Sequence, residues 1–192
     1  MLPEQQPTVA DLIIKKTLLW AVPQWVKPNW ITVLRFMTIP VVLYLLVAEY
    51  YWSSIILFTI SAFSDAVDGA IARTRNLITD WGKVYDPFAD KLLIGTVTAI
   101  IVTRYISPYL AMVILVIDLL LIINALYKKN VQHKVIQALF AGKMKMMLQS
   151  VGLWLLLANL VVTSSALVLL ATYLLYVAVL FALASLIVYR SV

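Results

Sequence analysis

The segment spanning residues 146–189 contains no charged side chain, and this feature limits most strongly what the chain can fold into. A membrane-spanning helix needs roughly 20 apolar residues, so the segment is long enough for two such helices. Asn159 and the polar residues 163–165 predict a turn between them. The composition agrees, because 64% of the 192 residues are hydrophobic, only 12% are charged and none is cysteine. An ordinary soluble domain, a disordered chain and a disulfide-stabilised secreted protein are therefore excluded.

Similar apolar segments recur along the chain, and we predict an all-α integral membrane protein with six transmembrane helices. Helices and closed barrels alone satisfy the backbone hydrogen bonds in lipid, and long apolar segments joined by short loops favour helices. Residues 8–22 are amphipathic, which predicts a preceding helix that lies in the membrane interface. We therefore expect an N-terminal interfacial segment, 1–29, and a membrane domain, 30–192. The predicted spans are 30–48, 51–72, 85–103, 108–127, 138–160 and 166–189.

The positions of the basic residues orient the predicted bundle. With six spans, both termini lie on the same side of the membrane as the loops after the second and fourth spans. Arg104 is the only basic residue in the loops on the opposite side. The positive-inside rule therefore places both termini in the cytoplasm, at an inner membrane or its equivalent. An odd number of spans is the alternative, and the loop charges do not favour it. Because topology accounts for the net charge of +6, we expect membrane lipids and no nucleic acid as partners. The basic residues on the cytoplasmic side are Lys15, Lys16, Lys27, Arg73, Arg75, Lys83, Lys128, Lys129, Lys134 and Arg190.

Four of the nine acidic residues lie in or beside two neighbouring apolar segments, where a carboxylate is costly. Asp65 and Asp68 are three residues apart and share one helix face, and Asp86 and Asp90 are four apart and share another. The basic connection between them contains Gly82, which allows the chain to turn back. Two antiparallel helices can thus direct four carboxylates into one polar pocket at the cytoplasmic boundary of the membrane.

Four carboxylates cannot lie together as bare anions, because like charges repel. Either some of them are protonated or divalent cations neutralise them, and oxygen-only ligands suit Mg²⁺, Mn²⁺ or Ca²⁺. Substrate phosphates usually complete a Mg²⁺ site that has few carboxylates. Gly69 and Ala72 leave room for a ligand to approach the backbone, and Arg73 and Arg75 follow as candidate phosphate ligands.

The spacing of these residues resembles the signature of the CDP-alcohol phosphatidyltransferase family, D-x2-D-G-x2-A-R-x8-G-x3-D-x3-D. Residues 28–35, 86–91 and 142–149 are similar to the family's phosphatidylglycerophosphate synthase and CMP-forming cardiolipin synthase branch. Members of that branch tend to carry an arginine before an acidic residue in the fourth helix, where this chain has Ile117 and Asp118. The positions that match the signature are Asp65, Asp68, Gly69, Ala72, Arg73, Gly82, Asp86 and Asp90.

The resemblance implies a six-helix homodimer that transfers a phosphatidyl group from CDP-diacylglycerol to an alcohol and releases CMP. The acceptor that we expect is glycerol 3-phosphate, which gives phosphatidylglycerophosphate. One alternative is phosphatidylglycerol as the acceptor, which gives cardiolipin. The other is a non-enzymatic, cation-binding transporter or scaffold.

The resemblance also implies roles for individual residues. Two divalent ions, Mg²⁺ or Mn²⁺, would be held by Asp65, Asp68 and Asp86, and Asp90 would be the general base and lie close to the second ion. The CDP group would contact Asp65, Asp68, Gly69, Ala72, Arg73 and Gly82.

Charge and depth in the membrane, rather than the signature, predict the residues that bind the acceptor. For Arg35 and Lys143, extension of the side chain to the interface is the alternative interpretation. Asp118 either pairs with a lysine of the bundle or belongs to the site. The predicted acceptor-binding residues are Arg35, Lys83, Lys143 and Lys145.

Overall fold

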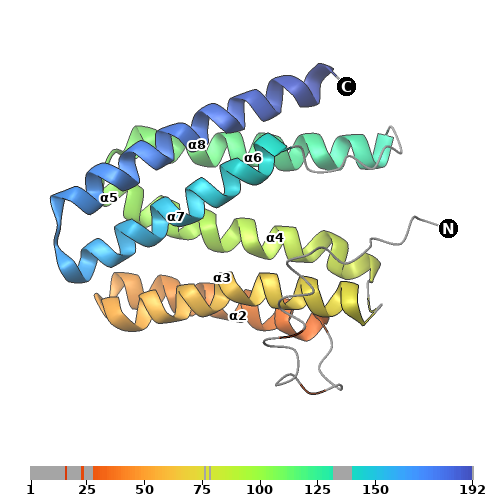
Figure 1. Cartoon of the computed structure of the whole chain (residues 1–192), viewed down its shortest axis with the longest axis horizontal. Coiled ribbons are helices and arrows are strands. Elements are labelled where there is room, and N and C mark those ends of the chain that lie inside the picture. The colour runs from red at the N-terminus through yellow and green to blue at the C-terminus, as the bar shows by residue number, and fades with distance from the viewer. Residues whose placement is uncertain are drawn as a thin grey trace. The chain divides into compact units, whose positions relative to one another are not determined.

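The computed structural model describes residues 16, 23, 28–75, 77, 79–131 and 140–191, and within these ranges it contains helices and no strand (Figure 1). The predicted all-α fold is therefore confirmed. The predicted interfacial helix over residues 8–22 lies almost entirely outside the described residues. The chain forms two compact units, Met1–Leu93 and Ile94–Val192.

The first unit is built on a helical hairpin. Its helices α2 (Pro28–Val47) and α3 (Tyr51–Thr74) lie side by side, as Figure 1 shows. Glu49 adopts a left-handed backbone conformation, with φ of 61°, in the short turn between them. Val67 and Ile71 of α3 are buried, and Ile31 of α2 packs against them. This contact fixes which face of α3 is directed towards α2.

The third helix, α4 (Asp80–Val97), is held against α2 at its start. Thr79 accepts a hydrogen bond from the backbone N–H of Gly82 and donates one to Asn29, over 3.0 and 2.9 Å. Phe36 and Phe88 pack with their ring centroids 6.1 Å apart. Because Thr79 satisfies a free backbone donor, the helix begins several residues before the predicted span at 85.

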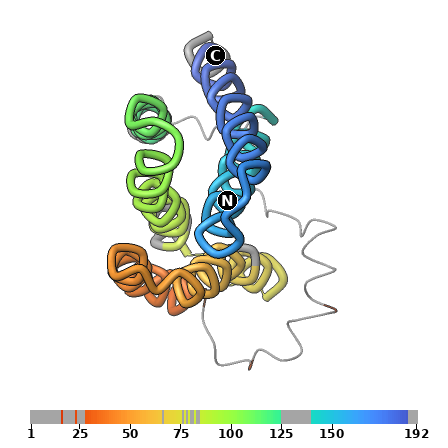
Figure 2. Tube along the Cα trace, turned by 90° about the vertical axis from the view of Figure 1, so that its left-hand side faces the viewer, coloured from red at the N-terminus to blue at the C-terminus, as the bar shows by residue number. Residues whose placement is uncertain are grey.

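The second unit contains the remaining helices. Its last two form a hairpin in which Asn159 accepts a hydrogen bond from the N–H of Ser164, 2.9 Å away, and Thr163 has a φ of 47°. Figure 2 shows this hairpin from a second direction, with its helices still adjacent. The turn predicted at Asn159 and residues 163–165 is thus confirmed. The elements are η1 (Thr98–Val102, a π-helix), α5 (Thr103–Tyr105), α6 (Pro108–Val131), α7 (Phe140–Val162) and α8 (Ser165–Ser191).

Within the described residues, the predicted spans coincide with helices. Four of the described helices, α2, α3, α7 and α8, are long and apolar enough to cross a membrane, and α6 contains a shorter apolar stretch, Pro108–Asn124. The third predicted span corresponds to α4 followed by η1 and α5, so a π-helical segment interrupts it. An integral membrane protein is the fold class that these helices support.

Candidate active site

Two of the predicted site aspartates bind one arginine from the neighbouring helix. Arg35 of α2 pairs with Asp65 and Asp68 of α3: its Nη1 lies 3.0 Å from Asp65 Oδ1, and its Nη2 lies 2.8 Å from Asp68 Oδ2. The predicted common face of Asp65 and Asp68 is therefore present, because both carboxylates reach the same guanidinium. Three charged groups of two different helices thus form one cluster.

The side chain of Arg35 is completely buried, whereas its two partner aspartates differ in exposure. Its side chain is 0% exposed and that of Asp68 is 2% exposed, whereas Asp65 remains 45% exposed. Ser64 accepts two further hydrogen bonds from Arg35, at 3.3 Å from Nε and 3.2 Å from Nη2. Ser64 in turn donates to the carbonyl of Ser61 over 2.7 Å. Burial of a charged group is tolerable here because the group is paired and hydrogen-bonded.

Asp86 lies beside this cluster at the start of α4. Thr32, which is fully buried in α2, donates a hydrogen bond to Asp86 Oδ1. Asp86 is also close enough to Arg35 and Asp65 for their charges to act on it. Asp90 follows one helical turn later and is buried, with 8% of its surface exposed. α2 therefore contacts carboxylates of both α3 and α4.

The arrangement can be compared with the needs of a divalent cation. Among the described residues, no three His, Cys, Asp or Glu side chains lie close enough together to hold a metal ion. The chemistry of the donors nevertheless fits a hard cation, since Asp65 and Asp68 direct their oxygens to one positive group and Asp86 is nearby. In this structure that positive group is Arg35. The carboxylate oxygens of these residues are therefore chemically suited to a divalent cation.

The two signature glycines lie where a side chain would displace a polar group of the site. A Cβ added at Gly69 would lie 3.0 Å from Nη2 and 3.2 Å from Nη1 of Arg73, one turn further along α3. A Cβ added at Gly82 would lie 3.1 Å from both Asp86 Oδ2 and Thr79 Oγ1. The sequence predicts that Gly69, Ala72, Arg73 and Gly82 contact the CDP group. Both glycines therefore lie against polar side chains of the site, and their contact with the CDP group stays a prediction.

The predicted acceptor-binding residues fall into both units. Arg35 and Lys83 belong to the first unit, and the side chain of Lys83 lies outside what the structure describes. Lys143 and Lys145 belong to the second unit, where Lys143 is exposed and Lys145 is buried. Arg35 is therefore described with the first unit, and Lys143 and Lys145 are described with the second.

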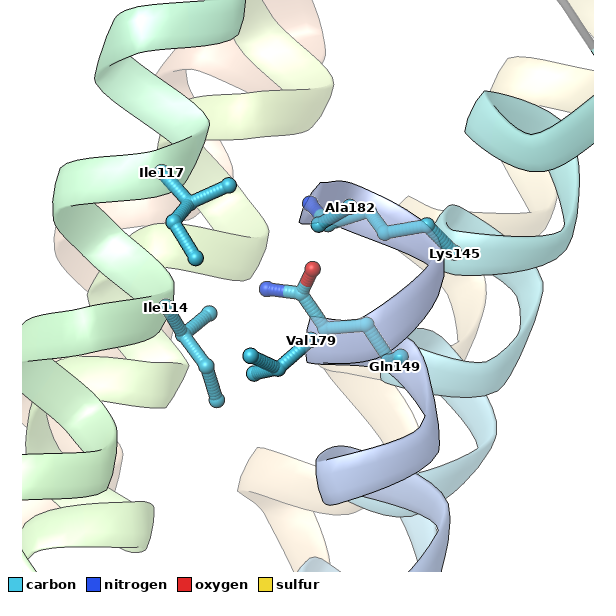
Figure 3. A pocket seen from close by; sticks show the side chains of 7 residues that line it. Ile114, Ile117, Lys145, Gln149, Val179 and Ala182 are labelled. Atoms are coloured by element: carbon cyan, nitrogen blue, oxygen red, sulfur yellow. The ribbon is translucent and has the colours of Figure 1, made fainter. Parts of the chain in front are cut away.

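Lys145 takes part in a polar network inside the second unit. It pairs with Asp118 of α6, which also accepts a hydrogen bond from Gln149 Nε2 over 3.2 Å. Gln149 Nε2 lies 3.5 Å from Thr98 Oγ1 as well. Figure 3 shows Lys145 and Gln149 extending from α7 towards α6, in a pocket with Ile114, Ile117, Val179 and Ala182. Of the two interpretations of Asp118, pairing with a lysine of the bundle is the one observed.

Comparison with known proteins identifies the family. The profile of the CDP-alcohol phosphatidyltransferase family matches residues 25–184, which include both units. The chain belongs to this family. The matched range includes the four aspartates of α3 and α4 whose spacing resembles the family signature.

Individual members of the family are similar over shorter stretches. A CDP-diacylglycerol–glycerol-3-phosphate 3-phosphatidyltransferase of Rickettsia typhi is 41% identical over 83 residues, which are 40% of this chain and 45% of that protein. The protein of the same name in Bacillus subtilis is 33% identical over 104 residues, 46% of this chain and 54% of the relative. A cardiolipin synthase (CMP-forming) / mitochondrial hydrolase fusion protein of Schizosaccharomyces pombe is 36% identical over 96 residues, 50% of this chain and 16% of the relative. The matched region thus spans about half the length of the first two relatives.

Two residues that contact the charged cluster, one through an aspartate and one through Arg35, are not among the predicted site residues. Thr32 and Ser64 bond to Asp86 and Arg35, respectively. A signal for Thr32 exists in the sequence: Thr32, Arg35 and Thr38 recur every third residue in an otherwise apolar helix. That spacing places them on one face, and Thr38 indeed lies 2.6 Å from Ser61 of α3. Polar periodicity within an apolar helix therefore marks the face that contacts the site.

Proposed function

We propose that this protein transfers the phosphatidyl group of CDP-diacylglycerol to glycerol 3-phosphate, which gives phosphatidylglycerophosphate and CMP. The observation that carries the proposal is the convergence of Asp65 and Asp68 on one cationic group, with Asp86 beside them. These residues stand at the signature positions of the family. The names of the relatives in Rickettsia typhi and Bacillus subtilis support the choice of donor and acceptor.

The proposed reaction is a single displacement at phosphorus. The hydroxyl oxygen of the acceptor attacks the phosphorus that carries the diacylglycerol group, and the bond from that phosphorus to the bridging oxygen of CMP breaks. Asp90 takes the proton of the hydroxyl, as a buried carboxylate within reach of the acceptor can. Arg73, whose guanidinium lies against Gly69, donates hydrogen bonds to the diphosphate, and the backbone at Gly69 and Gly82 contacts the nucleotide.

A divalent ion is part of the proposal. Two Mg²⁺ or Mn²⁺ ions, bound by Asp65, Asp68, Asp86 and Asp90, would neutralise the charge of the diphosphate and of the departing CMP. We also propose that the site and both termini face the cytoplasm, at an inner membrane or its equivalent, since the basic residues gather in the loops on that side. A homodimer is a further part of the proposal, supported by the family resemblance.

A second candidate acceptor is phosphatidylglycerol, which would give cardiolipin. The similarity to the cardiolipin synthase fusion protein of Schizosaccharomyces pombe favours it. The chemistry at phosphorus is the same for both acceptors.

The deciding experiment is an acceptor screen on the purified protein in detergent. CDP-diacylglycerol is supplied with Mg²⁺ or Mn²⁺ and with glycerol 3-phosphate, phosphatidylglycerol, serine or inositol phosphate, and both CMP and the mass of the lipid product are measured. We expect CMP with glycerol 3-phosphate, none with a chelator present, and none from the Asp65→Asn variant. Failure to release CMP with any acceptor would refute the enzymatic function and leave a cation-binding transporter or scaffold.

A further inference from the structure

Arg35, Asp65 and Asp68 together set the charge of the site before any ion binds. The guanidinium contributes one positive charge and the two carboxylates contribute two negative charges, with Asp86 close by. Arg35 and Asp68 are both buried, so water cannot screen these charges well. Without Arg35, the acidic face of α3 would hold uncompensated negative charge inside the helix pair.

The guanidinium holds one oxygen of each of two carboxylates that a divalent ion would need. Arg35 holds Asp65 Oδ1 and Asp68 Oδ2 through two separate nitrogens, at 3.0 and 2.8 Å. A Mg²⁺ ion bound by the same oxygens would approach them to about 2.0–2.1 Å. Two positive groups cannot share those oxygens at such distances, because they would repel each other at short range. Binding of the ion through these two oxygens and their pairing with Arg35 are therefore alternatives.

We propose that Arg35 is an internal counter-ion that competes with the divalent cation for Asp65 and Asp68. This proposal rests on the metal-dependent function proposed above and adds a positioning role for Arg35. In the metal-free protein Arg35 neutralises the carboxylates and joins α2 to α3. When the cation binds, the guanidinium leaves the two carboxylates while Ser64 still accepts from it. The released N–H groups can then donate to an anionic oxygen of a substrate, the role that the sequence predicts for Arg35.

The test is the Arg35→Gln variant, which removes the positive charge. Mn²⁺ is the probe, and its affinity is measured by electron paramagnetic resonance of the free ion, with the protein in detergent and no lipid substrate. We expect Mn²⁺ to bind about tenfold more tightly than to the wild type, a coupling within the range seen for linked binding events. The unfolding temperature without Mn²⁺ should fall, and its rise on addition of Mn²⁺ should be larger than in the wild type.

The matched control is Arg104→Gln, which removes the same charge from the second unit. Arg104 lies over the ring of Tyr105, 5.8 Å from its centroid, and its loss should leave Mn²⁺ affinity unchanged. If Arg35→Gln does not yield folded protein, Ser64→Ala is the second variant. It removes two hydrogen bonds of the guanidinium and should tighten Mn²⁺ binding in the same direction but to a smaller extent.

The opposite result would overturn the proposal. If Arg35→Gln binds Mn²⁺ more weakly than or equally to the wild type, Arg35 arranges the ligands or is irrelevant to them. If neither protein binds Mn²⁺, the proposal also fails, whereas binding that is gained only in the variant supports it. The proposed function fails separately, through the absence of CMP release by the wild type. An active wild type with unchanged Mn²⁺ affinity in the variant would contradict only the role of Arg35.

Discussion

Lys145 of α7 donates a hydrogen bond to Asp118 of α6, and both side chains are almost fully buried, with 8% and 13% of their surfaces exposed. Gln149 adds a second donor to the same carboxylate. This network explains how an acidic residue is tolerated in the apolar helix α6, since its charge is both neutralised and hydrogen-bonded. It also uses the lysine that the sequence assigns to the acceptor.

The pair predicts a large loss of stability when one partner is removed. Lys145→Met leaves the carboxylate of Asp118 buried without its ammonium partner, which should lower the free energy of unfolding by roughly 3–5 kcal/mol. Replacement of both residues, Lys145→Met with Asp118→Leu, should cost less than Lys145→Met alone, because no unpaired charge remains. Thermal unfolding in detergent measures both. The control is Lys143→Met, which removes an exposed lysine from the same helix and should have little effect. Equal losses for the two lysines would show that the buried pair is unimportant.

Gly69→Ala should separate substrate binding from stability. The new methyl group would lie 3.0 Å from Arg73 Nη2, so the guanidinium must move away from its position on α3. We expect the affinity for CDP-diacylglycerol to fall about tenfold, as the loss of a hydrogen bond to a charged group would produce. Stability should stay the same or rise, because alanine is better than glycine in a helix by about 1 kcal/mol.

Equilibrium binding of CDP-diacylglycerol and thermal unfolding together measure this prediction. Gly95→Ala is the matched control, since its Cβ would contact only Leu115 Cδ2 among the described residues, at 3.4 Å. Its affinity for CDP-diacylglycerol should equal that of the wild type. Wild-type affinity in Gly69→Ala would show that neither the glycine nor the position of Arg73 matters for the nucleotide.

Gly152 predicts a close contact between α7 and α8. A Cβ at this position would lie 3.1 Å from Leu175 Cγ and 3.4 Å from the carbonyl of Ala171, both on α8. Small residues allow helices to approach closely in membranes, so Gly152→Val should force them apart and cost roughly 1–3 kcal/mol in unfolding free energy. Gly142→Val is the comparison, since there the Cβ would be at an ordinary 3.7 Å from Ser185 Oγ. If both valines lower the unfolding temperature equally, close packing is not the cause.

The helices could be predicted from the sequence because apolar length alone defines them in a membrane protein. The start of α4 at Asp80, before the predicted span, could not be predicted, because it depends on the contact of Thr79 with Asn29, which lies far away in the sequence. The π-helical segment Thr98–Val102 leaves no trace in the hydrophobic pattern, since it changes the backbone hydrogen bonds and not the composition.

The site could be predicted only in part, because the sequence determines the spacing within a helix and not the packing between helices. The common faces of the aspartates follow from spacing within a helix, which the sequence contains. The pairing of Arg35 with Asp65 and Asp68 depends on which face of α2 meets α3, and that is decided by packing between helices. The sequence predicts that Arg35 binds the acceptor; the structure pairs it with Asp65 and Asp68, and the contact with the acceptor stays a prediction.

Asp90→Asn tests the general base. The amide has nearly the size of the carboxylate but cannot take a proton from the acceptor hydroxyl, so CMP release should fall about 100-fold or more. CDP-diacylglycerol should still bind, because Asp90 is buried one turn beyond Asp86 and is assigned to the acceptor side of the reaction. Asp65→Asn should instead weaken both binding and turnover, since it removes a ligand of the ion that would hold the diphosphate.

The rate of CMP release and the affinity for CDP-diacylglycerol, measured on the same preparations, distinguish these roles. Glu49→Gln is the control for loss of one negative charge, because Glu49 is exposed in the turn between α2 and α3 and should retain wild-type activity. If Asp90→Asn loses substrate binding as fully as Asp65→Asn does, the contact of Asp90 with the ion accounts for its whole role, and another group must accept the proton. If Asp90→Asn keeps the wild-type rate, a carboxylate at this position is not needed for the transfer at all.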